Sequence, residues 1–281
     1  MKVNNLEIIY GLASRARPYG ISKSLSKFKI ALNQINQLGI TQFDGAESYP
    51  WLNEDITYLN ENNTNKFYTK ISYENIRNLD IHLDKFRKSI QEKRVKGIYF
   101  HSPLNTNQDF LNLNKFFETI KEKNLIPGVS LYKSKEVIDL EKQKIIPQIV
   151  QLPINPSTKI DENVKKFKQT NFIARSIFLQ SAYFNPIKIS KNISNLLKLH
   201  ISKIGEVGKV YNYSLEESLL AYAITKANNL NFKGIILSTS SIKRLENQLH
   251  FASKQFEKDY FKKIDNAIYS FSEKLSDPRL W

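Results

Sequence analysis

The sequence predicts an α/β protein, specifically a (β/α)8 TIM barrel in which residues 1–281 form a single domain with an extra C-terminal helix. Short apolar runs alternate with longer helical patterns, and eight such pairs follow one another along the chain. The runs are continuously apolar or β-branched, which is typical of parallel strands covered by helices. A chain of 281 residues with 41% hydrophobic composition is long enough for one such barrel. A doubly wound open sheet is the alternative.

Each element follows from its local pattern. Strands are predicted at 6–13, 40–46, 66–72, 95–102, 125–132, 145–154, 171–178 and 232–240. Helices are predicted at 24–39, 52–62, 76–93, 111–124, 134–144, 161–169, about 190–228, 242–255 and within 256–275. Gly39 is the expected C-cap of the first helix, and Ser134 the expected N-cap of the helix that it begins.

Composition narrows the class of protein. The chain has no cysteine, so disulfides and cysteine-based metal sites are excluded, and we expect no metal centre. No signal peptide and no apolar run long enough to cross a membrane is evident, which predicts a cytoplasmic protein. The net charge of +15 would suit nucleic-acid binding, but the lysines are mixed with acids along helical segments. A solvated basic surface is therefore favoured, with no nucleic-acid partner.

The barrel predicts that functional side chains lie where strands end at their carboxyl side. Asp44, Lys70 and His101 occupy three successive strand ends, and Tyr49 lies in the loop after the first of them. The free pKa of a tyrosine, about 10, is too high for an efficient general acid, but a nearby ammonium lowers it. An aspartate would hold that ammonium, and an imidazole would orient a carbonyl oxygen. The set therefore suits proton delivery to a carbonyl.

These residues carry a resemblance to the aldo-keto reductase family, in the segments GITQFDGAESY, KFYTKIS and IYFHSP. Asp44, Tyr49, Lys70 and His101 are separated by five, 21 and 31 residues, an order like that of the family's catalytic set. Later segments match the family in the same order. The segments GVSLY, IVQLPIN and RSIFLQ resemble a bacterial branch of the family that is linked with sugar or surface-glycan metabolism. The resemblance implies NADPH-dependent reduction of an aldehyde or ketone, or the reverse oxidation. Tyr49 would be the proton donor.

The resemblance also implies where the cofactor would bind. The G-x-G-x-x-G fingerprint of Rossmann dehydrogenases is absent, as it is from this family. Ser130 and Gln151 would hold the carboxamide, Arg175 would stack on the nicotinamide, and Ser176 would lie by the pyrophosphate. The remaining matches concern the phosphates and the adenosine: Ser238, Ser240, Ser241, Arg244, Asn247 and Gln248. An N-capping serine before an ordinary charged helix is the alternative for this last segment.

The sequence departs from the family pattern at three places. Ser238 stands where many members have a lysine, so NADPH preference would rest on Arg244 and Lys243, and NADH remains an alternative. Leu131 replaces an asparagine that contacts the carboxamide. Pro50 replaces a glycine after the tyrosine, and Trp51 follows it as a candidate wall of the substrate pocket. Trp281 would either cover the barrel mouth or fray.

The same residues leave other functions open. Lys70 would serve as a Schiff-base amine in a barrel lyase, as in class I aldolases. A barrel of this kind would also suit a non-catalytic binding subunit. The substrate would be a small carbonyl compound, with a sugar-related molecule as one candidate, and the sequence specifies no oligomeric state.

Overall fold

Eight parallel strands close into a barrel in the computed structural model of the chain. The structure describes residues 1–13, 25–49, 58–59, 62, 64–72, 79–84, 95–101, 104, 107–186, 190–268 and 273–276. The strands are β1 (Lys2–Val3), β2 (Leu6–Gly11), β3 (Gln42–Asp44), β4 (Lys66–Ile71), β5 (Val95–Phe100), β6 (Ile126–Ser130), β7 (Ile149–Pro153), β8 (Asn171–Arg175) and β9 (Gly234–Leu237). Neighbours pair in chain order from β2 to β9, and β2 also pairs with β9, which closes the ring. The predicted barrel is confirmed.

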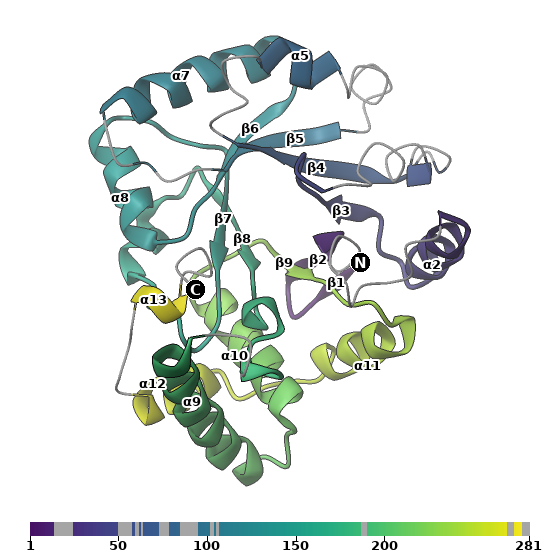
Figure 1. Cartoon of the computed structure of the whole chain (residues 1–281), viewed down its shortest axis with the longest axis vertical. Helices are drawn as coiled ribbons and strands as arrows, with labels where there is room; N and C mark the ends of the chain where they lie inside the picture. The colour runs from purple at the N-terminus through teal and green to yellow at the C-terminus, as the bar shows by residue number, and fades with distance from the viewer. Residues whose placement is uncertain are drawn as a thin grey trace.

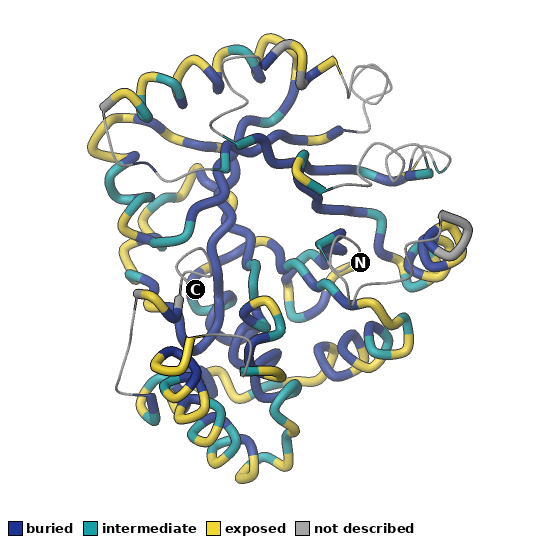
Figure 2. The backbone as a smooth tube through the Cα atoms, viewed as in Figure 1, coloured by how far each residue is buried: buried dark blue, intermediate teal, exposed yellow. Residues whose placement is uncertain are grey.

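The helices lie outside this ring (Figure 1). They are α2 (Leu25–Gln37), α5 (Leu79–Asp84), α7 (Asn107–Glu122), α8 (Ser134–Lys142), α9 (Lys191–Val210), α10 (Leu215–Asn229), α11 (Ile242–Ala252), α12 (Tyr260–Ala267) and α13 (Glu273–Ser276). Figure 2 shows the strands almost wholly buried, whereas most helices carry both buried and exposed residues, as expected when one stripe of a helix packs on a parallel sheet. The exception is α10, which is buried without interruption from Ser218 to Ala227. No helix in the described part of the chain is long and apolar enough to cross a bilayer.

Side chains fill the inside of the barrel. Tyr68 and Tyr99 stack there with ring centroids 5.6 Å apart, beside Ile9, Ile149 and Ile173. Gly128 makes room for this pair, because a Cβ at that position would lie 2.2 Å from Cδ1 of Tyr99. Desolvation raises the pKa of Tyr99 well above its usual value, so its phenol stays protonated. In the described part of the chain, the interior of the barrel is therefore a packed core.

The structure corrects several local predictions. Lys133, not Ser134, is the N-cap of α8: the Glu136 carboxylate accepts from the backbone N–H of Lys133 at 2.8 Å. Ser134 instead accepts a bond from the backbone of Asp161 through its hydroxyl. That aspartate precedes a short 3-10 helix, η1 (Glu162–Lys166), where an α-helix was predicted over 161–169.

The structure also differs from the sequence prediction in the helices after β8 and at the N-terminus. The long helical region predicted after β8 is two helices, α9 and α10, separated by a turn before Ser214. The hairpin of β1 with β2, in which Lys2 pairs with Glu7, was not predicted, because two residues carry no periodic signal. Gly39 has a φ of 79°, as expected of a glycine C-cap. Most of the predicted helix 52–62, with Pro50 and Trp51 before it, lies outside the described residues.

Candidate active site

The carboxyl ends of the strands surround a cavity of about 320 Å³. The four residues of the predicted catalytic set, Asp44, Tyr49, Lys70 and His101, all line it. So do Ser130, Arg175, Ser176 and Ser238, which the family resemblance relates to the cofactor. Parallel strands bring these positions together because their carboxyl ends meet at one rim. Trp51, predicted as a wall of the substrate pocket, and Trp281 lie outside the described residues.

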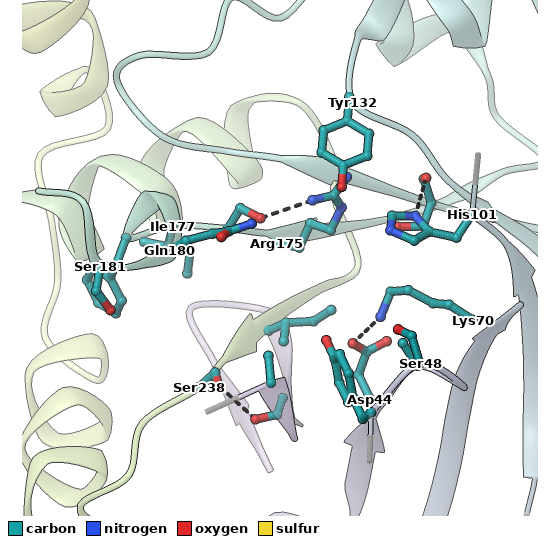
Figure 3. A pocket seen from close by; sticks show the side chains of 18 residues that line it. Asp44, Ser48, Lys70, His101, Tyr132, Arg175, Ile177, Gln180, Ser181 and Ser238 are labelled. Atoms are coloured by element: carbon teal, nitrogen blue, oxygen red, sulfur yellow. Dashed lines mark hydrogen bonds and ion pairs between the residues drawn. The ribbon is translucent and has the colours of Figure 1, made fainter. Parts of the chain in front are cut away.

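A buried ion pair joins the ends of β3 and β4. The Lys70 ammonium donates to Oδ2 of Asp44 and, at 3.1 Å, to the carbonyl of Gly45 (Figure 3). The side chains are only 7% and 6% exposed. Gln151 donates to the other Asp44 oxygen at 2.7 Å, so Gly45 and Gln151 together hold the ammonium and the carboxylate in place. An ion pair this deeply buried is costly to form, because both charges lose their contact with water.

Burial acts on Lys70 in a definite direction. Desolvation lowers the pKa of its ammonium, Asp44 opposes this through its charge and its hydrogen bond, and Arg175 adds to the lowering. The proton of Lys70 is therefore held less tightly than that of a lysine in water.

A tight turn carries Tyr49 from the end of β3 to the cavity. The backbone N–H of Glu47 donates to the carbonyl of Lys70 at 2.9 Å, and that of Tyr49 to Ala46 at 2.9 Å. The first of these bonds attaches the loop to β4 beside the ion pair. Tyr49 is half-buried and packs against the core while lining the cavity. The loop after β3 thus brings Tyr49 to the same cavity as Lys70.

His101 follows β5 on the same rim. Its Nδ1 lies 3.0 Å from the carbonyl of Ser130. A carbonyl oxygen only accepts, so Nδ1 carries a proton, and Nε2 of the neutral ring is an acceptor. The ring also stacks on Tyr132, with centroids 5.6 Å apart. His101 can therefore donate to a substrate oxygen only when it is doubly protonated.

Arg175 brings a second cation to the cavity. It donates to the carbonyl of Leu131 at 2.7 Å and to the hydroxyl of Ser176 at 3.0 Å, and Tyr132 lies 4.5 Å from its guanidinium carbon. In Figure 3 this ring covers one side of the guanidinium. Burial lowers the pKa of Arg175, opposed chiefly by Tyr132 and then by Asp44. Within the described part of the chain, Arg175 forms no ion pair.

The cavity fits a nicotinamide dinucleotide in one respect and differs from expectation in another. The Ser130 hydroxyl is buried with no hydrogen-bond partner among the described residues, so a polar ligand group could satisfy it. Gln151 does not line the cavity, because its amide nitrogen holds Asp44. Ser238 lines the cavity and donates to the carbonyl of Gly11 at 2.8 Å.

A second hollow, which we call the outer pocket, lies beyond β9. It has a volume of about 480 Å³ and is lined by Ser214, Glu216, Glu217, Leu220, Ser241, Lys243, Arg244, Asn247, Gln248 and Phe251. Ser240 is exposed before α11, and Ser241 caps that helix by accepting from the backbone N–H of Arg244 at 3.2 Å. Phe178 lines the cavity at the strand ends, and its ring centroid lies 5.8 Å from the Arg244 guanidinium carbon. The two hollows are therefore neighbours.

Sequence reasoning missed several residues of the cavity wall. Tyr132 lies two residues after β6, and Gln180 and Ser181 belong to the turn η2 (Leu179–Ser181) after β8. That turn is strained: Leu179, Gln180 and Ser181 have φ values of 45°, 54° and 70°. Non-glycine residues in this region often mark functional sites. No sequence pattern announces such a turn without glycine or asparagine.

The closed parallel barrel with its polar rim defines the class of fold, and comparison with known proteins defines the family. The chain belongs to the aldo/keto reductase family, an oxidoreductase family whose model matches residues 7–268. No curated protein sequence matches the chain. The family membership that was predicted from Asp44, Tyr49, Lys70 and His101 is thus confirmed. The roles of these four residues stay predictions.

Solved structures agree with this assignment. The holo form of an aldo-keto reductase from Bacillus halodurans is similar with a TM-score of 0.70 and 11% identity over 99% of each chain. An aldose reductase from Giardia lamblia has a TM-score of 0.60 and 16% identity over 93% of this chain and 91% of its own. A Gox0644 variant in complex with NADPH has a TM-score of 0.63 and 12% identity over 93% of this chain and 89% of its own. At these identities the likeness establishes the fold alone.

Proposed function

We propose that this protein reduces an aldehyde or ketone to the alcohol, with Tyr49 as proton donor in a set with Asp44, Lys70 and His101. The observation that carries the proposal is the buried Asp44–Lys70 ion pair, in the cavity that Tyr49 also lines. A bound nicotinamide supplies the hydride that the carbonyl carbon accepts. The Tyr49 hydroxyl gives its proton to the carbonyl oxygen, and the resulting phenolate lies in the field of the Lys70 ammonium.

The other residues have supporting roles. Asp44 keeps Lys70 charged and fixed, and Gln151 fixes Asp44. The Ser130 hydroxyl is available to the carboxamide of the cofactor, and the Arg175 guanidinium to its nicotinamide ring. His101 orients the substrate oxygen: as imidazolium it donates to a carbonyl, and as neutral imidazole it accepts from the product alcohol through Nε2.

The donor is a reduced nicotinamide dinucleotide. The family resemblance, through Arg244, favours NADPH, and a Gox0644 variant binds that molecule. The contacts of Arg244 with Glu216 in this chain favour NADH instead. The substrate is a small carbonyl compound, and a sugar-related one is consistent with the polar cavity wall of Ser48, Gln180 and Ser181. A cytoplasmic location, a single domain over 1–281, and the absence of a nucleic-acid partner stay predictions of the sequence.

The test begins with cofactor binding. Titration of the protein into NADH and into NADPH should change the nucleotide fluorescence, and at least one of them should raise the melting temperature. Turnover is then measured with 4-nitrobenzaldehyde and glyceraldehyde. The variant Tyr49→Phe should bind cofactor unchanged and lose roughly 10²- to 10⁴-fold in kcat, the usual contribution of a general acid. Tyr213→Phe, far along the chain between α9 and α10, is the matched control and should keep full activity.

A lyase that uses Lys70 as a Schiff-base amine is the competing activity. To form the imine, Lys70 would have to give up its bonds to Asp44 and Gly45. Borohydride should therefore trap no adduct of the carbonyl substrates at Lys70. A trapped adduct, or a fully active Tyr49→Phe variant, would contradict the reductase assignment.

A further inference from the structure

Both cations of the outer pocket are already paired with carboxylates. Arg244 donates from Nε to Oε1 of Glu216 at 2.7 Å, across the space between α11 and α10. Lys243 lies 3.4 Å from Glu246 on its own helix. Among the lining residues, Glu216 and Glu217 balance the charges of Lys243 and Arg244. The pocket therefore offers a dianionic phosphate no net positive charge, although the chain as a whole carries +15.

Glu216 also takes the second residue that would contact the adenosine. Gln248 donates to the same oxygen of Glu216 at 2.6 Å, which leaves the Gln248 carbonyl buried without a partner. The other oxygen of Glu216 accepts no bond from the described residues. The Oε1 atom of Glu216 thus holds both Arg244 and Gln248, and its Oε2 atom can accept a hydrogen bond from a ligand.

The ribose 2′ position distinguishes the two cofactors chemically. In NADH it is a hydroxyl, which donates well to a carboxylate; in NADPH it is a phosphate, which needs a cation and is repelled by a carboxylate. We propose that the outer pocket selects the 2′-hydroxyl of NADH, and that Glu216 is the residue that determines this preference. The inference rests on the proposed function and concerns its cofactor.

Moving Arg244 away from Glu216 would cost free energy, because Arg244 would also lose its contacts with two aromatic rings. Its guanidinium carbon lies 4.9 Å from the ring centroid of Phe184 and 5.8 Å from that of Phe178. These two rings add cation–π contacts to the ion pair. Binding a 2′-phosphate would bring its charge beside Glu216 or require Arg244 to leave both rings. Binding a 2′-hydroxyl requires neither.

The alternative role for Glu216 is to support NADPH binding, and this role predicts a different result. If Glu216 merely oriented Arg244 toward a phosphate through the remaining N–H groups, removing its charge would weaken NADPH binding. Selection of a hydroxyl predicts the reverse, because the Glu216→Gln variant would release Arg244 and remove the repulsion. The two roles therefore give changes of opposite sign.

The experiment measures binding and needs no carbonyl substrate. Dissociation constants for NADH and NADPH are determined by fluorescence, and those for 5′-AMP and 2′,5′-ADP by calorimetry, for the wild-type protein, Glu216→Gln and Glu217→Gln. The wild type should bind NADH more tightly than NADPH. In Glu216→Gln the preference should shift toward NADPH and 2′,5′-ADP by roughly 10- to 100-fold, the scale of one charge-assisted bond.

Glu217→Gln is the matched control. Glu217 lines the same pocket but accepts from the backbone and hydroxyl of Ser214, both at 2.8 Å, as part of the N-cap of α10. It should leave the ratio unchanged, so an equal shift in both variants would overturn the specific role of Glu216. Tighter NADPH binding by the wild type that weakens in Glu216→Gln would overturn the proposal as well. If the wild type binds neither cofactor, the proposed function itself fails.

Discussion

The cavity at the strand ends, which we propose to be the catalytic cavity, and the outer pocket each contain an arginine, and the two arginines differ in their partners. Arg175, which the surrounding barrel desolvates, donates only to neutral oxygens in the described structure. Arg244 is 40% exposed and pairs with Glu216. Arg175 has no ion-pair partner among the described residues at the place where the reaction is proposed to occur. The charge of Arg244 is paired at the place where the adenosine would bind. Under the two proposals, the Arg175 charge would act on the reaction, whereas the paired Arg244 charge would act on the choice of cofactor.

The ion pairs of the two regions should differ most in their effect on stability. Asp44→Asn leaves the Lys70 ammonium buried without its counter-charge, and we expect a loss of about 3–5 kcal/mol in the free energy of unfolding. Glu216→Gln breaks a partly exposed pair and should cost at most about 1 kcal/mol. Urea denaturation of both variants measures the difference.

A double variant separates the charge from the loss of contacts. Asp44→Asn combined with Lys70→Met removes both charges, so it should be more stable than Asp44→Asn alone. Equal losses for Asp44→Asn and Glu216→Gln would show that the two regions do not differ as described.

The packing beneath the catalytic cavity gives the next largest effect. Gly128→Ala places a methyl group 2.2 Å from the Tyr99 ring, which stacks on Tyr68 inside the closed barrel. Overpacking of this kind costs about 1–3 kcal/mol. Gly205→Ala on α9, where a Cβ would meet no atom within 4 Å, is the control and should be neutral or slightly stabilising. An undisturbed Gly128→Ala melting curve would contradict the close packing.

The smallest expected effect concerns pH. Arg175 lowers the pKa of Lys70, so the wild-type ammonium loses its proton at a lower pH than it would without Arg175. Removing this positive charge with Arg175→Met favours the protonated form, and the fall of kcat on the alkaline side should move to higher pH. The profile is measured at saturating cofactor. Arg244→Met, in the outer pocket, should leave its position unchanged; a shift in that variant alone would contradict the assignment.

The sequence predicted most of the fold because its signals are local and repeated. Eight continuous apolar runs specify parallel strands, and once the barrel is given, Asp44, Lys70, His101 and Arg175 must meet at one rim. The roles assigned to these residues stay predictions, since no comparison tests them. The strand ends β3 and β4 were located to within a few residues.

What the sequence could not predict depends on contacts between distant segments. Glu216 and Arg244 are 28 residues apart on different helices, and no spacing rule links them. Ser134 has the residue type of an N-cap, but its hydroxyl accepts a hydrogen bond from the backbone of Asp161, 27 residues further along the chain. The start of α10, in contrast, has a recognisable sequence pattern, because Ser214 and Glu217 form an S-x-x-E capping box. The place of Tyr132 in the cavity wall, where its ring contacts Arg175 and His101, likewise follows no local sequence pattern.

The pairing of β2 with β9 has a consequence for synthesis of the chain. Glu7 pairs with Gly234 and Tyr10 with Leu237, so the first barrel strand must wait for the last one. A growing polypeptide emerges from the ribosome at about 5–20 residues per second, so β2 presents an open sheet edge for roughly 10 s or longer before closure. Exposed edges of this kind invite pairing with other chains. We therefore expect the nascent protein to depend on chaperones until the final seam forms.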